Sequence, residues 1–470
     1  MGQRVSHLPR RRKHKKTDRL TKTERRACVL QRQEQWIAQW IALAKAFIEM
    51  LLNSEMQELL GREPHQWGDR RAPVEVNACC DRCQRKYRGW FRRNGTYSRS
   101  LVTDGVVIEF CVPRLRCACG GTVDVSFSVF APYQRVSPEA TMRLLEAVAL
   151  GLTLRQVGAV TAPANGAPLA KSTINGRVLE VSRLVEAFHK GALERIPPVV
   201  LVDGLWVKVM EPTGERFVDG KGRNQPRVKR KKVGLLVAYG VDPATGDWWV
   251  LDWERAEQED EASWERLLER LRQRGLTAEK GLRLIVSDGS EGLAAALGLV
   301  DLGPGVRHQR CVFHKLRNVA KAVKASLAAS KEDKQKQREQ VVKEAASIYE
   351  GQDRAEILRR RDQFVAKWQE TEPEAVATLL RDFEKTIEYL EVLAAARARG
   401  EAWEVRYLRT TSALERLNRT LRRMVRQVVL FHCDAGLEVR VYLILMQAGE
   451  MLIPQGDDWL EVLGSELAAT

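Results

Sequence analysis

The pattern of hydrophobic and polar residues changes several times before residue 197. Within residues 27–70, apolar side chains return at helical spacing, which predicts one long amphipathic helix. Its apolar face packs either in the protein core or against a second copy of the chain in a dimer. Residues 71–130 show strand-like alternation around two pairs of cysteines, and residues 137–195 return to helical spacing broken by short turns. Residues 27–195 are therefore predicted to form a long helix, a strand-rich segment and a group of shorter helices, in that order.

From residue 197 to 320 the pattern is mainly that of strands. Short apolar runs predict strands at 199–203, 205–210, 232–240, 248–253 and 282–288, and one apolar face predicts a helix at 261–274. Three antiparallel strands, a helix and then a parallel strand predict the mixed sheet of a ribonuclease-H-like α/β core.

Residues 321–405 are helical in pattern and highly charged. This stretch is far longer than the loops that connect elements of one sheet, so it predicts an all-α insertion into the core. Residues 406–470 would then complete the core and add C-terminal helices. The predicted fold class is a multi-domain α+β protein with an interrupted α/β core.

The charge of the chain favours a nucleic-acid partner. Its 77 Lys and Arg residues exceed its 61 Asp and Glu residues, for a formal charge of +16. Phosphate backbones attract such an excess because Lys and Arg release counterions when they bind. Residues 1–26 alone hold eleven basic residues against two acids, which predicts a disordered, DNA-attracted tail. A solvated tail without a role is the alternative.

The expected compartment is the cytoplasm, near the nucleoid of a prokaryotic host. No apolar run approaches the ~18 residues that span a bilayer, so we expect no membrane partner. The basic N-terminus is not followed by the apolar segment of a signal peptide. The nine cysteines are an odd number without an export signal, which argues against a disulfide framework and for a reducing setting.

Two close cysteine pairs predict a structural zinc site in residues 71–130. The pairs are Cys80 with Cys83 and Cys117 with Cys119, and four thiolates satisfy the tetrahedral preference of Zn²⁺. A zinc ribbon, with one pair on each hairpin, is the predicted module. The one-residue gap of the second pair is less typical, and Cys79 is an alternative ligand. Incidental buried cysteines are the other interpretation.

Three further stretches are candidates for DNA contact. Residues 137–195 resemble a helix-turn-helix module, whose last helix opens near Ser172, although a plain helical bundle would look similar. A basic loop between two predicted strands could hold a phosphate backbone. With the N-terminal tail, the candidate DNA-binding residues are Arg11, Arg12, Lys13, Lys171, Ser172, Thr173, Asn175, Arg177, Lys229, Arg230, Lys231 and Lys232.

Three carboxylates occupy positions from which they could meet. Asp203 follows one apolar run, Asp288 ends another, and Glu415 lies on a later helix. Two-metal cleavage of a phosphodiester needs acidic oxygens that hold two ions roughly 3.5–4 Å apart. Taken alone the pattern is weak, because the chain holds 61 acids and each of these could serve a turn or a helix cap.

The sequence motifs around these residues resemble those of the Mutator-type DDE transposases of bacterial insertion sequences. They are Val202-Asp203-Gly204, Ser287-Asp288-Gly289, Arg310-Cys311-Val312-Phe313-His314 and Thr410-Thr411-Ser412-Ala413-Leu414-Glu415-Arg416-Leu417-Asn418, in this order. Two features depart from the family pattern: the zinc ribbon is an addition, and Ser-Ala-Leu-Glu stands where Asn-Ala-Ile-Glu is frequent.

The resemblance implies a reaction and a set of residues. Asp203, Asp288 and Glu415 would be the catalytic triad and the ligands of Mg²⁺ or Mn²⁺. The reaction would be cleavage at the terminal inverted repeats of a mobile element and transfer of the 3′ ends to target DNA, by a homodimer or larger assembly. Cys311, His314, Asn418 and Trp368 would be supporting residues, with Cys311 and His314 either orienting the site or only packing.

Two other functions remain open at this level. One is a DNA-binding regulator with a zinc ribbon, a helix-turn-helix and an inactive transposase core. The other is a structure-selective nuclease on the same fold.

Overall fold

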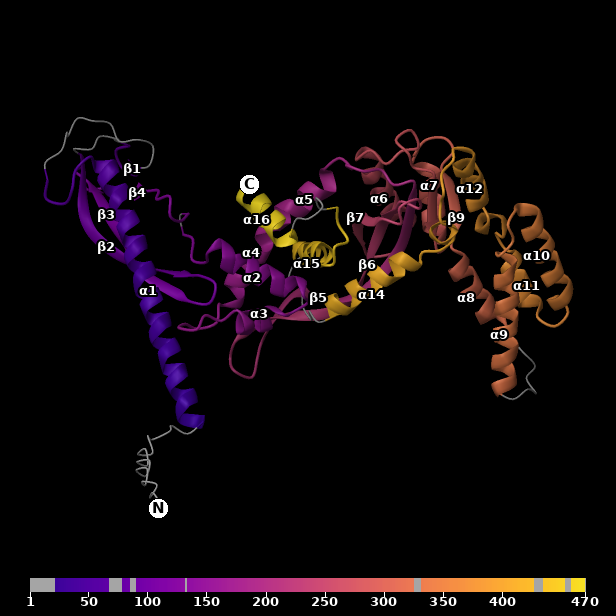
Figure 1. Ribbon diagram of the computed structural model, residues 1–470, viewed down its shortest axis with the longest axis horizontal. Helices are drawn as coiled ribbons and strands as arrows, with labels where there is room; N and C mark the ends of the chain where they lie inside the picture. The colour runs from indigo at the N-terminus through magenta and orange to yellow at the C-terminus, as the bar shows by residue number, and fades with distance from the viewer. Residues whose placement is uncertain are drawn as a thin grey trace, which may run out of the picture. The chain divides into compact units, whose positions relative to one another are not determined.

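The computed structural model describes residues 22–66, 78–84, 90–131, 133–324, 331–426, 434–452 and 458–469. The predicted tail contacts Arg11, Arg12 and Lys13 lie outside these residues. The chain divides into two compact units, labelled element by element in Figure 1. Unit 1 comprises residues 1–140 and 162–168, and unit 2 comprises residues 141–161 and 169–470.

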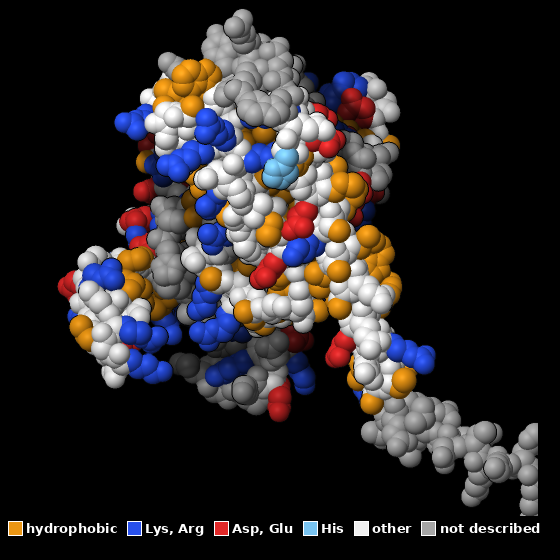
Figure 2. All heavy atoms as spheres, turned by 90° about the vertical axis from the view of Figure 1, so that its left-hand side faces the viewer, with side chains coloured by type: hydrophobic (Ala, Val, Ile, Leu, Met, Phe, Trp, Pro, Cys, Tyr) orange, Lys and Arg blue, Asp and Glu red, His pale blue; other side chains and the backbone are white. Residues whose placement is uncertain are grey.

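Unit 1 combines one long helix with a small antiparallel sheet. Its elements are α1 (Lys22–Leu60), β1 (Ala78–Cys80), β2 (Phe91–Val102), β3 (Val107–Cys117) and β4 (Thr122–Val125), and the strand order is β1-β4-β3-β2. The C-terminal half of α1 buries Leu52, Met56 and Leu60 against the sheet. The helix and the ribbon, which we predicted as separate segments, thus share their cores. Figure 2 shows hydrophobic side chains left at the surface of unit 1.

Unit 2 begins with four helices. They are α2 (Pro138–Ala149), α3 (Leu154–Val160), α4 (Lys171–Glu180) and α5 (Ser182–Lys190). Ser137 caps the first of them, since its hydroxyl accepts a hydrogen bond from the N–H of Ala140. The last helix differs from its prediction as a single element, because it breaks at Val181 into α4 and α5.

The five-stranded sheet of unit 2 is mixed. Its strands are β5 (Val199–Val218), β6 (Asn224–Val241), β7 (Trp248–Ala256), β8 (Leu284–Ser287) and β9 (Arg307–Arg310), in the order β7-β6-β5-β8-β9. β5, β6 and β7 are antiparallel, whereas β8 and β9 run parallel to β5. This is the predicted succession of three antiparallel strands, a helix and a parallel strand.

Two details of the predicted strands are wrong. The runs 199–203 and 205–210 belong to one strand of 20 residues, so Asp203 lies within β5 rather than at its end. The basic stretch predicted as a loop is mostly strand, because β6 begins at Asn224 and pairs with β5 from Val218 inward. Only residues 219–223 form the turn of this long hairpin.

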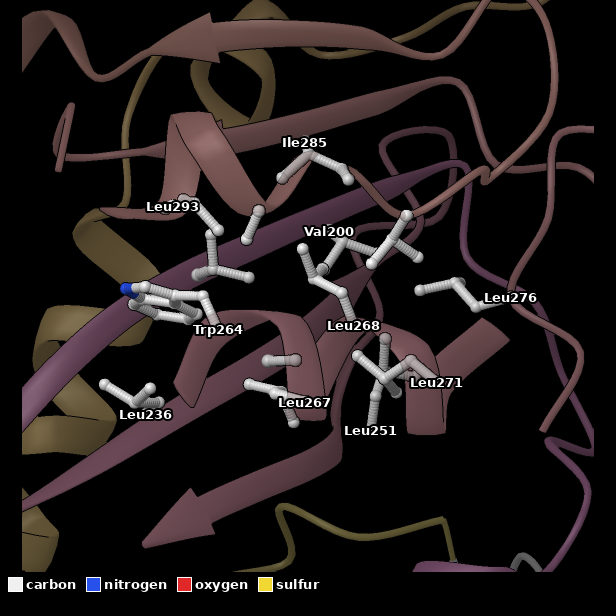
Figure 3. Close-up of a cluster of buried hydrophobic side chains, with 14 of the residues drawn as sticks. Val200, Leu236, Leu251, Trp264, Leu267, Leu268, Leu271, Leu276, Ile285 and Leu293 are labelled. Atoms are coloured by element: carbon white, nitrogen blue, oxygen red, sulfur yellow. The ribbon is translucent and has the colours of Figure 1, made fainter. Parts of the chain in front are cut away.

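Two helices cover one face of the sheet and form the core in Figure 3. They are α6 (Glu261–Gln273) and α7 (Glu291–Leu299). α6 starts where the side chain of Asp260 accepts a hydrogen bond from the N–H of Ser263, a normal N-cap. Its apolar face buries Trp264 and Leu268 against Val200 and Ile285, and each such side chain contributes roughly 1.5–3 kcal/mol.

The predicted insertion is mainly helical among its described residues. It contains α9 (Lys331–Ile348), α10 (Arg354–Trp368), α11 (Pro373–Leu380), the 3-10 turn η2 (Glu384–Thr386), α12 (Tyr389–Ala398) and α13 (Val405–Arg409). α8 (Val312–Ala322) packs into the same hydrophobic core through Val312 and Val319. The chain then returns along α14 (Ser412–Arg426), α15 (Asp434–Gln447) and α16 (Trp459–Ala469). None of the described helices has the length and hydropathy of a membrane span.

Candidate active site and metal sites

Strand register brings Asp203 and Asp288 together. β5 and β8 pair in parallel at Val199 with Leu284, Val200 with Ile285 and Leu201 with Val286. Two residues further along each chain stand Asp203 and Asp288, and neighbouring strands lie only about 4.8 Å apart. At this point β8 ends, while β5 continues with β6 alone. The two carboxylates therefore lie where the strands separate.

The environment of Asp203 is unfavourable for its negative charge. Burial raises the pKa of Asp203 to about 6, and the charge of Asp288 acts in the same direction. His314 and Asn418 act in the opposite direction, and the Nδ2 of Asn418 donates a hydrogen bond of 2.8 Å to Oδ2 of Asp203. A cation beside these oxygens would relieve the repulsion.

Helix α14 carries Glu415 to the same place. Glu415 and Asn418 are three residues apart and share a helix face, so the hydrogen bond of Asn418 fixes that face toward Asp203. Oε1 of Glu415 lies 3.8 Å from Nε2 of His314, and His314 feels the charges of both Asp203 and Asp288. Among the described residues, this buried Oε1 has no hydrogen-bond partner. The three predicted triad residues thus lie in one region of unit 2, linked through Asn418 and His314, whereas among the described residues only the four cysteines of unit 1 have ligand atoms close enough together to hold a metal ion as they stand.

Cys311 and His314 connect the elements that carry the three carboxylates. The N–H of Cys311 donates to the carbonyl of Ser287, next to Asp288. Its thiol accepts hydrogen bonds of 3.4 Å from the N–H and the hydroxyl of Thr411, immediately before α14. The carbonyl of Thr411 in turn accepts from the N–H of Glu415. Cys311 is the N-cap of α8 rather than a residue within it.

Two other residues have roles that are mainly local. His308 lies 2.8 Å from the hydroxyl of Ser287, and burial lowers its pKa to about 4, so it is neutral. Trp368 is buried in the core of the insertion, where its indole N–H donates to Glu344. Its described contacts lie within that helical subdomain and do not include the three carboxylates.

Sequence reasoning missed a fourth carboxylate, that of Glu259. A Cβ placed on Gly204 would lie only 2.9 Å from Oε2 of Glu259, which therefore sits against the residue that follows Asp203. Burial, together with the charges of Asp288 and Asp203, raises the pKa of Glu259 to about 7. In sequence, Glu259 looks like an ordinary acid before a helix, because acids are common at helix N-termini.

The four predicted zinc ligands form one cluster in unit 1. The sulfur atoms of Cys80, Cys83, Cys117 and Cys119 all lie within 4.8 Å of one another. The Cys80–Cys119 and Cys83–Cys117 pairs are each 3.5 Å apart. A tetrahedron with Zn–S bonds of about 2.3 Å has edges of about 3.8 Å, so the donor set fits Zn²⁺. Cys79 instead lies 3.0 Å from Oε1 of Gln84, outside the cluster.

Backbone geometry explains the unusual one-residue gap between Cys117 and Cys119. Gly120 has a φ of +84°, a conformation that favours glycine. A Cβ on Gly121 would come within 2.8 Å of the sulfur of Cys80. The Gly-Gly pair therefore lets the chain turn tightly and approach the other knuckle closely.

The candidate DNA-binding residues in unit 2 differ in their solvent exposure and in whether they pair with an acidic residue. At the start of α4, Lys171 and Ser172 are exposed, Thr173 and Asn175 are half-buried, and Arg177 pairs with Glu180. On β6, Lys231 pairs with Glu211 and Glu257. Lys229, Arg230 and Lys232 are exposed. Lys208 on β5 stands directly opposite Lys232 on β6 in the strand register, so their side chains lie on the same, basic face of the hairpin.

Comparison with known proteins identifies the family. The family model described as Transposase, Mutator family matches residues 14–453. The transposase for insertion sequence element ISRM5 of Rhizobium meliloti is 27% identical, over 72% of this chain and 74% of that protein. That for IS905 of Lactococcus lactis is 24% identical, over 83% of each. Among solved structures, the Drosophila P element transposase strand transfer complex aligns with a TM-score of 0.39 and 11% identity, over 68% of this chain and 93% of that one. The chain belongs to the Mutator family of transposases.

Proposed function

We propose that this transposase cleaves DNA at the ends of a mobile element and joins the 3′ ends to target DNA. Asp203, Asp288 and Glu415 are its catalytic triad, on a ribonuclease-H-like core that the insertion interrupts. The observation that supports the proposal is that Asp203 on β5 and Asp288, directly after β8, follow neighbouring parallel strands, while α14 brings the face that carries Glu415 toward Asp203. The hydrogen bond from Asn418 to Asp203 supports it, because Asn418 shares a helix face with Glu415.

The residues fit divalent cations that prefer oxygen ligands. The site offers carboxylate oxygens, which Mg²⁺ and Mn²⁺ prefer as ligands, with His314 beside Glu415. Oε1 of Glu415 and Oδ1 of Asn418 are buried without a hydrogen-bond partner within the described chain. Bound Mg²⁺ or Mn²⁺ would activate the attacking oxygen and stabilise the leaving one.

The protein itself contributes orientation and charge balance. The amide of Asn418 donates to Oδ2 of Asp203 and so orients this carboxylate. Cys311 and Thr411 fix the start of α14, and the carbonyl of Thr411 accepts a hydrogen bond from the N–H of Glu415, so they position Glu415. His314 lies 3.8 Å from Glu415, and a hydrogen bond with Cys311 and the charges of Asp203 and Asp288 raise its pKa. We therefore assign Cys311 and His314 an orienting role.

Recognition of DNA falls to basic surfaces outside the triad. α4 would enter a groove with Lys171, Ser172 and Asn175, and the basic face of the β5–β6 hairpin would hold a phosphate backbone. Arginines exposed on the ribbon, including Arg92, Arg114 and Arg116, would add contacts with phosphates. The partners are terminal inverted repeats and target DNA.

The test is strand cleavage and joining on DNA that carries the element's ends. The wild type with Mg²⁺ or Mn²⁺ should nick and join. Asp203→Asn, Asp288→Asn and Glu415→Gln should each lose at least about 1,000-fold while still binding DNA. Glu291→Gln, an exposed acid in the first turn of α7, is the matched control and should stay active.

Three results would contradict the proposal. Binding without nicking by the wild type would favour an inactive core that serves as a regulator. Cleavage without joining would favour a nuclease. Full activity of any triad variant would remove that residue from the site.

We also propose that Cys80, Cys83, Cys117 and Cys119 hold one structural Zn²⁺. Metal analysis of the purified protein should find one zinc per chain. Cys83→Ser should lose it, whereas Cys79→Ser, a matched change next to the cluster, should keep it. Retention of zinc by Cys83→Ser would argue against this ligand set.

A further inference from the structure

Helix α1 carries two apolar faces, and only one of them is covered within unit 1. Ala44, Ile48, Leu52 and Met56 face the sheet. A second set of large side chains is more than half exposed: Val29 (53%), Leu30 (52%), Trp36 (61%), Trp40 (57%), Leu43 (63%), Phe47 (55%) and Met50 (57%), of which all but Leu30 form one stripe. In Figure 2, hydrophobic side chains are visible on the helical stem that leads to the grey N-terminal residues. Such a continuous exposed apolar face marks an interaction site.

The spacing of this second face identifies the kind of partner. From Trp36 onward its members follow one another at alternating intervals of four and three residues, and Val29 precedes Trp36 by seven. An apolar repeat of 3.5 residues is the narrow seam of a coiled coil, because it keeps one stripe against a second helix. A helix that packs on a sheet or a lipid surface instead shows a broader stripe. The partner is therefore another long α-helix.

No other described helix of this chain offers a matching seam. The exposed large hydrophobic residues on the described helices of unit 2 include Val160 on α3, Leu299 on α7, Phe313 on α8 and Leu380 on α11. Each stands alone on its helix. A second copy of α1 does present the same repeat over the same length.

The residues beside the seam suit pairing of identical helices. Along its central part they are Ile37, Gln39, Ala44, Ala46, Leu51 and Asn53. None is charged, so two copies meet without like-charge repulsion, which commonly prevents such pairing. The seam exposes on the order of 700 Å² per helix, given that an aromatic side chain offers roughly 150–250 Å². Two copies reach about 1,400 Å², the size of a stable interface.

We propose that α1 pairs with α1 of a second copy in a two-stranded coiled coil, which makes the protein a dimer before it meets DNA. The interface is independent of the proposed chemistry, because none of its residues belongs to unit 2.

The test is the mass of the full-length protein in solution, by sedimentation equilibrium without DNA. The wild type should be a dimer at low micromolar concentration. Trp40→Glu with Phe47→Glu should be a monomer, since loss of each central aromatic weakens association at least about 30-fold. Ala38→Glu with Ala42→Glu, which adds the same charges to exposed positions of α1 outside the seam, should remain a dimer.

Retained zinc and unchanged helical circular dichroism would show that the seam variant still folds, because Ile48, Leu52 and Met56 are intact. A monomeric wild type would overturn the proposal. So would a dimer that the seam variant leaves unchanged, because the contact would then lie elsewhere.

Discussion

At the scale of single residues, Asn418 is the most informative side chain near the triad. It is buried, it donates to Asp203, and it lies one helical turn from Glu415. An amide that orients a carboxylate ligand adds affinity for the metal without binding it, and loss of such support typically costs 10–100-fold. Its contribution can therefore be separated from that of the ligands themselves.

We expect Asn418→Ala to raise the Mg²⁺ concentration needed for half-maximal cleavage by about 10-fold or more. Asp203 would lose the hydrogen bond that lowers its pKa, so more metal would be needed to keep it ionised. The measurement is cleavage rate against Mg²⁺ concentration. Arg419→Ala, the exposed neighbour, is the control and should leave the metal requirement unchanged. An unaltered requirement in Asn418→Ala would show that its hydrogen bond is only structural.

Substitution of Glu259 should lower the cleavage activity without lowering the stability of the fold. Glu259→Gln keeps the shape of the side chain but removes a buried charge that Asp288 and Asp203 repel. Cleavage should fall by about 10-fold or more, while thermal stability stays equal or rises, as at strained functional sites. Glu257→Gln, an exposed acid paired with Lys231, is the control. A less stable but fully active Glu259→Gln would assign this residue to folding alone.

The sequence predicted Asp203, Asp288 and Glu415 but not Glu259, for a physical reason. The first three lie in sequence motifs that resemble those of a known family. Asp203 and Asp288 also lie at the ends of apolar runs. Glu259 precedes the N-cap Asp260 in an acidic stretch that any helix start could contain. Only the close approach of Gly204, a contact between distant segments, distinguishes it from a surface acid.

At the scale of elements, a buried ion-pair network joins α5 to the sheet. Asp252 on β7 is fully buried and accepts hydrogen bonds from Arg270 and Arg274, and His189 on α5 lies 2.6 Å from it. Glu438 on α15 lies on the other side of the His189 ring. Breaking such a network leaves charges buried without compensation, which typically costs 3–5 kcal/mol. The network thus fastens the helices around the edge strand β7.

His189 should make stability depend on pH near neutrality. Burial alone would lower the pKa of His189, but Asp252 and Glu438 raise it overall. A raised pKa means that the protonated ring stabilises the fold below about pH 6.5, the unfolded value, and that this stabilisation is lost as pH rises through the folded pKa. Asp252 has a lowered pKa, so its own contribution is lost only in acid.

We expect His189→Gln to cost about 1–2 kcal/mol at about pH 5.5 and clearly less at about pH 8.5. The measurement is the urea midpoint of the full chain, followed by tryptophan fluorescence. Lys190→Gln, an exposed neighbour, should cost little at either pH. An equal cost at both values would mean that the imidazole acts through packing on Trp253 rather than through its charge.

Element boundaries show where local patterns mislead. Asp203-Gly204 interrupts an apolar run and suggests a turn, yet β5 passes through it because β6 pairs with both sides. The basic stretch near Lys229 has little apolar character, yet it forms a strand by pairing with residues of β5. The helix α6, which has a normal N-cap and one apolar face, was predictable because all its signals are local.

At the scale of the whole molecule, the two proposed metal sites lie in different units and differ in chemistry. The triad in unit 2 offers a few carboxylate oxygens, so Mg²⁺ bound there would keep several waters and stay accessible to a chelator. The four thiolates in unit 1 would enclose Zn²⁺ completely and contribute directly to folding. Loss of one metal should therefore leave the function of the other intact.

We expect EDTA to stop DNA cleavage immediately and added Mg²⁺ to restore it, with zinc still bound throughout the experiment. A mercurial reagent that reacts with thiols should instead release zinc. That treatment should make residues 78–125 sensitive to protease while leaving unit 2 resistant, because the sheet of unit 1 has only a small core around the cluster. The measurements are cleavage rate, zinc release followed with a metal-binding dye, and proteolytic fragments. Loss of cleavage after zinc release by the mercurial, with Mg²⁺ still present, would show that the two sites are not independent. A ribbon that stays resistant after zinc release would show that the cysteines do not hold the fold of unit 1.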